Sequence, residues 1–145
     1  MMIPPSSPPS RKPRLVRVLV VDDNPQVLHD LRQLLELSGA VEVVGEAESG
    51  LEAVRLAAGL SPDVVVMDLE MPVMDGYKAT ARIKAGQPAP RVVILSVHAG
   101  PGEVERARAA GADSFVAKGT GYQILLNAIL GKDGSTNSFE KGEKS

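Results

Sequence analysis

Five short apolar runs, most of them rich in valine, constrain the fold of this chain more than any other feature. They lie at residues 15–21, 41–45, 64–67, 92–96 and 114–117, and helix-length stretches separate them. Runs of this kind are typical of strands that are buried on both faces of a parallel sheet. The alternation therefore predicts an α/β fold, with a five-stranded, doubly wound parallel sheet of the flavodoxin-like (βα)5 type.

Helix signals lie between the predicted strands. Asn24 is a predicted N-cap and is followed by a proline suited to a first helical turn. Ser49, with Glu52 three residues later, has the capping-box pattern. The apolar stripes of these first two helices include Leu34 and Leu51. Further helices are expected at about 77–85, 102–110 and 122–130.

The two ends of the chain differ from the region between them. Residues 1–13 contain five prolines and three serines, and residues 132–145 are mostly polar. Neither segment has the periodic apolar pattern that a packed core requires. We therefore expect a disordered tail at 1–13, one folded domain at 14–131 and a flexible polar tail at 132–145.

Composition excludes several classes of protein. The 145 residues include no cysteine, which rules out disulfides, thiolate metal sites and a cysteine nucleophile. Residues 15–131 carry 10 basic and 15 acidic side chains, a net charge of −5, which argues against a nucleic-acid-binding domain. No apolar stretch approaches the ~18 residues of a membrane span. The N-terminus lacks the hydrophobic segment of a signal peptide, so a cytoplasmic protein is expected.

Polar and charged residues follow four of the predicted strands. Asp22 and Asp23 close the first apolar run, Asp68 closes the third, Ser96 ends the fourth and Lys118 follows the fifth. Ligands of open α/β sheets bind at the carboxyl ends of the strands. The sequence therefore predicts that three carboxylates, a hydroxyl and an ammonium group share one edge of the sheet.

This set of groups suits one kind of chemistry. Crowded carboxylates need a cation, and an all-oxygen site that keeps room for water or phosphate favours Mg²⁺. A lysine supplies positive charge to the oxygens of an anion, and a serine hydroxyl donates to another of them. Together these groups indicate phosphoryl transfer onto an aspartate, for which an ionised carboxylate needs no general base.

These residues resemble a known family. The order of Asp22-Asp23, Asp68, Ser96 and Lys118 after their strands is similar to that of the response-regulator receiver domain of two-component signalling. The segment at residues 68–76, DLEMPVMDG, is very close to the signature loop of that family. The segment at residues 109–118, AAGADSFVAK, resembles receivers of the nitrate-regulator type. The resemblance covers residues 15 to about 131.

The resemblance implies a role for each residue of the acidic site. Asp68 is the expected phosphoacceptor. Asp22 and Asp23 are expected to help bind Mg²⁺, with Asp23 as a direct ligand, and the main-chain carbonyl of Glu70 is expected to complete the protein ligands. Lys118 is the expected phosphate-binding lysine.

The resemblance also implies switch and tuning residues. Ser96 is the expected switch hydroxyl, and Phe115 is the aromatic partner whose rotamer is expected to report phosphorylation. Glu70 and His98 occupy the two variable positions that flank the phosphoryl group and tune dephosphorylation in the family. Gly119 stands where many receivers have proline, so a trans peptide bond before it or an altered loop is expected.

The function that follows is a phosphoacceptor signalling module and not an enzyme acting on a separate substrate. A histidine kinase or phosphotransfer protein is the expected partner, and phosphorylation is expected to switch a partner-binding or self-binding face made by the fourth helix, the fifth strand and the fifth helix. A homodimer formed on phosphorylation belongs to this expectation. If the chain is a fragment of a longer regulator, a DNA-binding output domain is expected as well.

Two other functions remain open on the sequence alone. One is a receiver-like scaffold that works without phosphorylation. The other is a Mg²⁺-dependent aspartyl phosphatase, in which Glu70 would take the place of the second acid. The sequence MP after Glu70 departs from the phosphatase pattern. A dinucleotide-binding site is disfavoured because no Gly-x-Gly-x-x-Gly segment follows the first strand.

Overall fold

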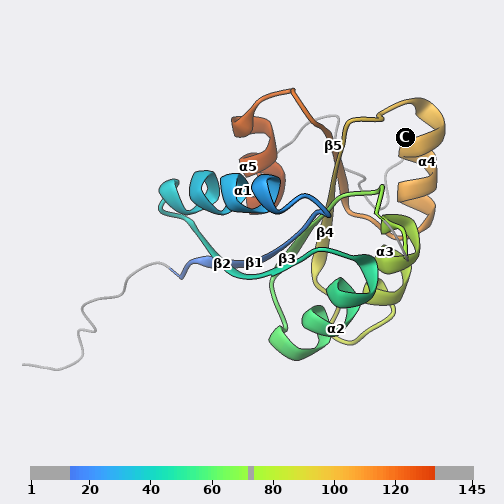
Figure 1. Cartoon of the computed structure of the whole chain (residues 1–145), viewed down its shortest axis with the longest axis horizontal. Coiled ribbons are helices and arrows are strands. Elements are labelled where there is room, and N and C mark those ends of the chain that lie inside the picture. The colour runs from blue at the N-terminus through green and yellow to red at the C-terminus, as the bar shows by residue number, and fades with distance from the viewer. Residues whose placement is uncertain (1–13, 72–73, 133–145) are drawn as a thin grey trace, which may run out of the picture.

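A computed structural model describes residues 14–71 and 74–132 of the chain. Strands and helices alternate throughout this part (Figure 1). The strands are β1 (Val16–Val21), β2 (Val41–Ala47), β3 (Val64–Met67), β4 (Arg91–Ser96) and β5 (Ser114–Ala117). The helices are α1 (Pro25–Leu37), α2 (Gly50–Leu60), α3 (Gly76–Lys84), α4 (Pro101–Ala109) and α5 (Tyr122–Leu130). All ten lie within a few residues of their predicted positions.

The strands form one parallel sheet in the order β2-β1-β3-β4-β5. Helices α1 and α5 cover one face of the sheet, and α2, α3 and α4 cover the other (Figure 1). The strand order reverses between β1 and β3, which is where doubly wound sheets of this order bind ligands. The predicted flavodoxin-like fold is therefore confirmed.

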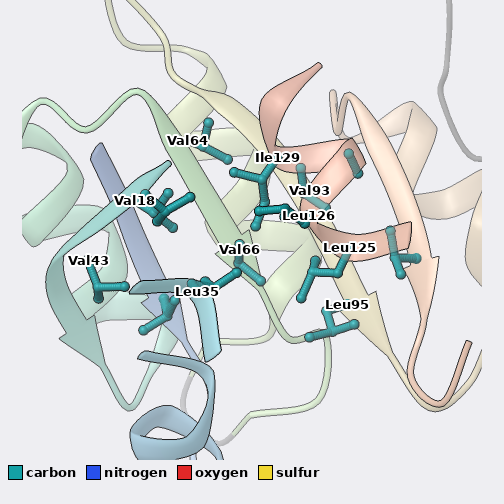
Figure 2. Close-up of a cluster of buried hydrophobic side chains, with 14 of the residues drawn as sticks. Val18, Leu35, Val43, Val64, Val66, Val93, Leu95, Leu125, Leu126 and Ile129 are labelled. Atoms are coloured by element: carbon teal, nitrogen blue, oxygen red, sulfur yellow. The ribbon is translucent and has the colours of Figure 1, made fainter. Parts of the chain in front are cut away.

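Aliphatic side chains fill the core on both faces of the sheet. Alternate residues of β1 illustrate the arrangement: Val18 and Val20 pack under α1 and α5, whereas Leu19 and Val21 pack under α2 and α3. Figure 2 shows the cluster on the α1 and α5 face. Full burial of each such side chain contributes about 1.5–3 kcal/mol to folding. Valine-rich strands can therefore form the core of this chain, which has no tryptophan.

Local signals account for the starts of α1 and α2. The Asn24 side chain accepts hydrogen bonds from the backbone of Gln26 and Val27, and the Ser49 side chain accepts one from Glu52. The Glu52 carboxylate in turn accepts from the Glu48 backbone, 2.9 Å away. Both predicted caps are therefore present.

The predicted apolar stripes are wrong at two positions. Leu34 is 45% exposed and Leu51 is 47% exposed. In α2 the buried face is made instead by small residues, Ala53 and Ala57 among them. The inward face of α2 is therefore made of small side chains, and the larger Leu51 lies on the exposed side.

The two predicted tails, 1–13 and 132–145, lie outside the described residues except for Lys132. Among the described helices, none is long and apolar enough to cross a membrane.

Candidate functional site

The register of the sheet places the predicted site residues at one edge. Val21 of β1 pairs with Met67 of β3, so Asp22 and Asp68 both come directly after a paired position. The Asp68 amide extends this ladder by donating to the Val21 carbonyl at 3.1 Å. Parallel pairing thus holds the backbones of the two acids side by side.

The same principle positions the remaining two groups. Ser96 pairs with Ala117 across β4 and β5, and the Lys118 amide donates to the Ser96 carbonyl at 2.8 Å. Ser96 therefore ends the strand next to β3, and Lys118 follows the strand one place further from it.

Three carboxylates form a cluster that is able to hold a metal ion. One oxygen from each of Asp22, Asp23 and Asp68 lies within 4.8 Å of the other two. Asp22 and Asp68 are buried, whereas Asp23 is exposed. Carboxylate oxygens at this density suit a hard divalent cation, and the exposed Asp23 leaves one side open to water or phosphate.

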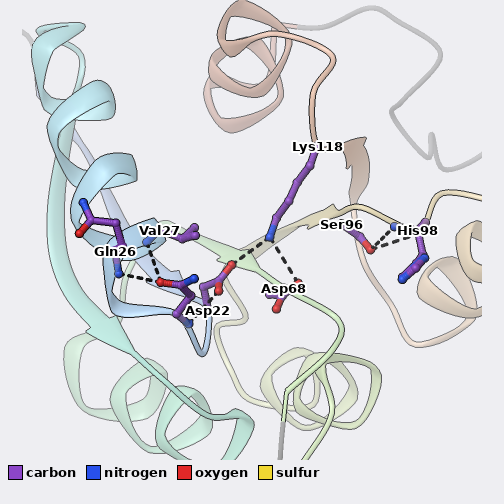
Figure 3. Close-up of polar contacts among 8 residues, drawn as sticks. Asp22, Gln26, Val27, Asp68, Ser96, His98 and Lys118 are labelled. Carbon is purple, nitrogen blue, oxygen red and sulfur yellow. Dashed lines mark hydrogen bonds and ion pairs between the residues drawn. The ribbon is translucent and has the colours of Figure 1, made fainter.

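Lys118 reaches into this cluster (Figure 3). Its Nζ atom lies 3.1 Å from Asp22 Oδ2 and 3.8 Å from Asp68 Oδ1. A second Asp22 oxygen accepts a hydrogen bond from the Asn24 backbone at 3.0 Å. Asp22 is therefore held on both sides, and Lys118 supplies the one cation in contact with the two buried acids among the described residues.

The pKa of Asp68 is raised from an ordinary 3.8 to about 6. Burial is the largest cause, and the neighbouring charge of Asp22 adds to it. Lys118 opposes the increase, as does the backbone N–H of Glu70. At pH 7 the carboxyl group is still mostly ionised, so no separate base is needed to deprotonate it.

A glycine brings the β3–α3 connection against the acidic cluster. The Gly76 amide donates to the Leu69 carbonyl at 2.9 Å. A Cβ atom at Gly76 would lie 2.2 Å from the Asp68 carbonyl oxygen, which is far too close. Position 76 must therefore be glycine for the loop to fold back over Asp68.

The two flanking residues predicted from the resemblance contact each other. His98 Nε2 lies 3.1 Å from Glu70 Oε2, and both side chains are more than half exposed. The Ser96 hydroxyl is buried and bonds to the backbone of His98 (Figure 3). Among the described residues, no hydrogen bond joins the Ser96 hydroxyl to the side chain of Asp68 or of Lys118.

A cavity of about 670 Å³ opens beside the cluster. It is lined by Asp23, Leu69, Glu70, Met71, Asp75, Tyr77, Ser96, His98, Gly102, Glu103 and Arg106. Sequence reasoning missed Tyr77 and Arg106, whose guanidinium carbon lies 3.8 Å from the centre of the tyrosine ring. No sequence signal pairs these two residues, since they lie on different helices.

Phe115 and Gly119 complete the set of predicted positions. Phe115 is 4% exposed and packs in the core on the α2 and α3 face. Any inward rotation of this ring would thus begin from a side chain that is already buried. Gln87–Pro88 is the only cis peptide bond in the described part of the chain, so the bond before Gly119 is trans, as expected.

Comparison with known proteins identifies the family. The family model of the response regulator receiver domain matches residues 18–130. This chain is a response regulator receiver domain. The receiver domain family binds Mg²⁺ at an acidic pocket and consists typically of signalling modules rather than catalysts, with histidine kinases or phosphotransfer proteins as partners.

Individual relatives agree with this assignment. The receiver domain is 38% identical over 125 residues to the response regulator protein VraR of Staphylococcus aureus, covering 86% of this chain and 60% of that protein. It thus spans less than two thirds of the length of this relative. The solved signal receiver domain of NarL from Mycobacterium tuberculosis is 37% identical, with a TM-score of 0.78 over 82% of this chain and 96% of that one.

A further solved relative is a complex that contains BeF3 and magnesium. The CheX–CheY–BeF3–Mg²⁺ complex of Borrelia burgdorferi is 25% identical to this receiver domain, with a TM-score of 0.71 over 79% of this chain and 87% of that one. The fold and the acidic cluster described above therefore belong to a family whose members include proteins solved with magnesium.

Proposed function

We propose that Asp68 is the phosphoacceptor of this receiver domain. One carboxylate oxygen attacks the phosphorus of the donor, and the bond between phosphorus and the donor's leaving nitrogen or oxygen breaks. The electron pair leaves with the donor, and an acyl phosphate forms on Asp68. The observation that carries this proposal is the convergence of Asp22, Asp23 and Lys118 on the one carboxylate whose pKa is about 6.

Magnesium fits the residues at this site. Asp22, Asp23 and Asp68 would hold the ion through their carboxylates, and Glu70 would add its main-chain carbonyl. When bound, Mg²⁺ offsets charge on the transferring phosphoryl group. Lys118, which already lies near Asp68, would bind another phosphoryl oxygen once it moves away from Asp22.

The phosphodonor in this proposal is a histidine kinase or a phosphotransfer protein, as in the family. The output is a change at the face formed by α4, β5 and α5, through Ser96 and Phe115, which a partner or a second copy of the chain then binds. If the chain is part of a longer regulator, a DNA-binding output domain would read this change.

We also propose that Glu70 and His98 set the lifetime of the acyl phosphate. Their side chains meet at 3.1 Å, and both residues line the cavity that Asp23 of the acidic cluster also lines. In this proposal the two side chains hinder the approach of water to the phosphorus. Truncation of either side chain to alanine is expected to shorten the half-life of the phosphorylated protein.

Intact mass after incubation with acetyl phosphate tests the phosphoacceptor directly. A phosphate-sized mass gain is expected with Mg²⁺ and not with a chelator. Asp68→Asn should abolish the gain, whereas Asp30→Asn, which changes an exposed aspartate of α1, should leave it intact. Absence of a gain under every condition would reject the proposal and favour a phosphorylation-independent scaffold, while catalytic release of phosphate from small esters would favour a phosphatase.

A further inference from the structure

The loop that follows Ser96 occupies the single proton of its hydroxyl group. Its oxygen accepts a hydrogen bond from the His98 amide at 3.1 Å, and it lies 3.2 Å from the His98 carbonyl, to which the hydroxyl donates. A serine hydroxyl has a single proton to donate. While these bonds persist, the hydroxyl has no proton left to donate to an oxygen near Asp68.

The residue that holds Ser96 through its backbone is itself held through its side chain. His98 Nε2 contacts Glu70 Oε2 at 3.1 Å. This contact ties the β4–α4 loop to the β3–α3 loop, in which Glu70 lies two residues after Asp68. A series of contacts thus runs from Glu70 through His98 to Ser96.

Other contacts of this loop are sparse. Val97, His98 and Ala99 are all exposed, and no helix or strand includes them. Helix α4, which the loop enters, has Ala107 as its single buried residue. A segment with so few buried contacts changes conformation at small cost, so one side-chain contact has a measurable influence on its position.

We infer that Glu70 and His98 are positioning residues for Ser96, because their side-chain contact holds the β4–α4 loop in the conformation that occupies the Ser96 hydroxyl. The inference rests on the proposed function, because Ser96 is the hydroxyl that would bind a phosphoryl group on Asp68. The positioning of Ser96 takes place in the unphosphorylated protein, so it is separate from the proposed effect of Glu70 and His98 on hydrolysis of the acyl phosphate. Loss of the contact releases the hydroxyl.

The exposure of the two side chains sets how strongly the Glu70–His98 contact favours this conformation of the β4–α4 loop. The side chains of His98 and Glu70 are 56% and 60% exposed. Contacts between exposed charged groups shift an equilibrium by a factor of about 1.4 to 5. Either the neutral Nε2–H form of the imidazole or its protonated form can donate to the carboxylate, so both forms of His98 are able to make this contact.

Hydrogen exchange of the His98 amide, followed by NMR in unphosphorylated protein without metal, tests the positioning. Exchange is expected to be about 1.4- to 5-fold faster in Glu70→Ala. Glu70→Gln keeps an acceptor oxygen and should restore the slower rate. Glu105→Ala is the matched control, because the Glu105–Arg108 pair on α4 has similar exposure, 62% and 55%. Unchanged exchange in Glu70→Ala would overturn the inference.

Binding of beryllium fluoride with Mg²⁺ tests whether the effect passes through Ser96. Glu70→Ala is expected to bind this phosphoryl analogue a few-fold more tightly than the unaltered protein. In a Ser96→Ala background the gain should vanish. A gain that persists without the hydroxyl would overturn the inference, because it would arise from removing negative charge near an anion. If neither the unaltered protein nor any variant bound beryllium fluoride, the result would count against the proposed function. The hydrogen-exchange rates of the His98 amide would then be the test of the positioning of Ser96.

Discussion

The Lys118 ammonium group lies closer to Asp22 than to Asp68, at 3.1 Å against 3.8 Å. The lysine therefore lies near two buried acids at once, and its shorter contact is with Asp22 and not with Asp68, the proposed phosphoacceptor. Transfer of Lys118 to a phosphoryl group on Asp68 would leave Asp22 in need of another cation, which Mg²⁺ supplies in the proposed mechanism.

Replacement of Lys118 by methionine is expected to raise the pKa of Asp68 above its value of about 6, since Lys118 lowers it in the native protein. Methionine preserves much of the apolar stem and removes the charge. Titration of aspartate carboxyl carbons by NMR, without metal, measures the change. Lys84→Met is the control, because Lys84 pairs with Asp113 at 2.8 Å and takes no part in the cluster. An unchanged pKa in Lys118→Met would show that the ammonium does not act on Asp68.

Asp68→Asn is expected to stabilise the metal-free protein at pH 7. The pKa of Asp68 is about 6 in the folded protein and 3.8 ordinarily, so the folded state binds more protons between these values and loses stability as pH rises through them. We expect a gain in unfolding free energy of about 1–2 kcal/mol above pH 6, reduced from the full shift because solvent reaches the site.

Urea denaturation at several pH values measures this gain. The difference between Asp68→Asn and the native protein should shrink as pH falls from about 6 to 4, where the native carboxyl group becomes protonated in the folded state. Asp30→Asn, at an exposed position, provides the baseline for other titrating groups. A difference that stays constant with pH would contradict the raised pKa.

Gly76→Ala is expected to lower the free energy of unfolding by about 1–3 kcal/mol, because the added methyl group must displace backbone. It would stand 2.2 Å from the Asp68 carbonyl oxygen and 2.7 Å from the Leu69 Cα atom. The displacement should also slow phosphorylation by acetyl phosphate. Chemical denaturation and intact mass provide the two readouts.

Gly59→Ala is the matched control for that change. Gly59 lies in α2, and nothing beyond its own stretch of helix comes within 4 Å of the position that an added methyl group would take. Alanine should therefore stabilise the helix by about 0.5–1 kcal/mol. Equal changes in unfolding free energy for Gly59→Ala and Gly76→Ala would show that the close approach of backbone to Gly76 does not cause the loss of stability.

Thr80→Val is expected to raise the free energy of unfolding by about 1 kcal/mol, since it removes an unpaired polar group while keeping the shape of the side chain. Among the described residues, the Thr80 hydroxyl is the one buried side-chain polar atom without a hydrogen-bond partner. Thr80→Ser keeps the hydroxyl and removes the methyl group, so it should destabilise the protein. Thermal unfolding of both variants checks the prediction, and a loss of stability in Thr80→Val would contradict it.

Much of this molecule is predictable from sequence because its strands are short and buried on both faces. The run at 64–67 has no polar residue and is flanked by turn residues, so no other element fits it. The meeting of Asp22, Asp68 and Lys118 follows from the same pattern, since parallel strands end at a common edge. Predicting that edge required no knowledge of any side-chain conformation.

The residues that each helix turns toward the core were harder to predict from the sequence. Leu34 and Leu51 have the spacing of core residues and yet are exposed, whereas the small Ala53 is buried. Helical periodicity states which residues share a face. It does not state how closely that face approaches the sheet, and the distance of approach decides whether a leucine or an alanine fits there.

The sequence by itself determined the order of strands and helices along the chain and the capped starts of α1 and α2. It also determined which charged groups lie at the carboxyl ends of the strands. These features depend on short-range preferences and on the alternation of strands with helices. Only the tertiary structure decided the contacts between loops and helices, such as Glu70 with His98 and Arg106 with Tyr77. The physical reason is that these side chains come from segments about thirty residues apart, and their meeting depends on how the loops fold and how the helices pack, which no local pattern encodes.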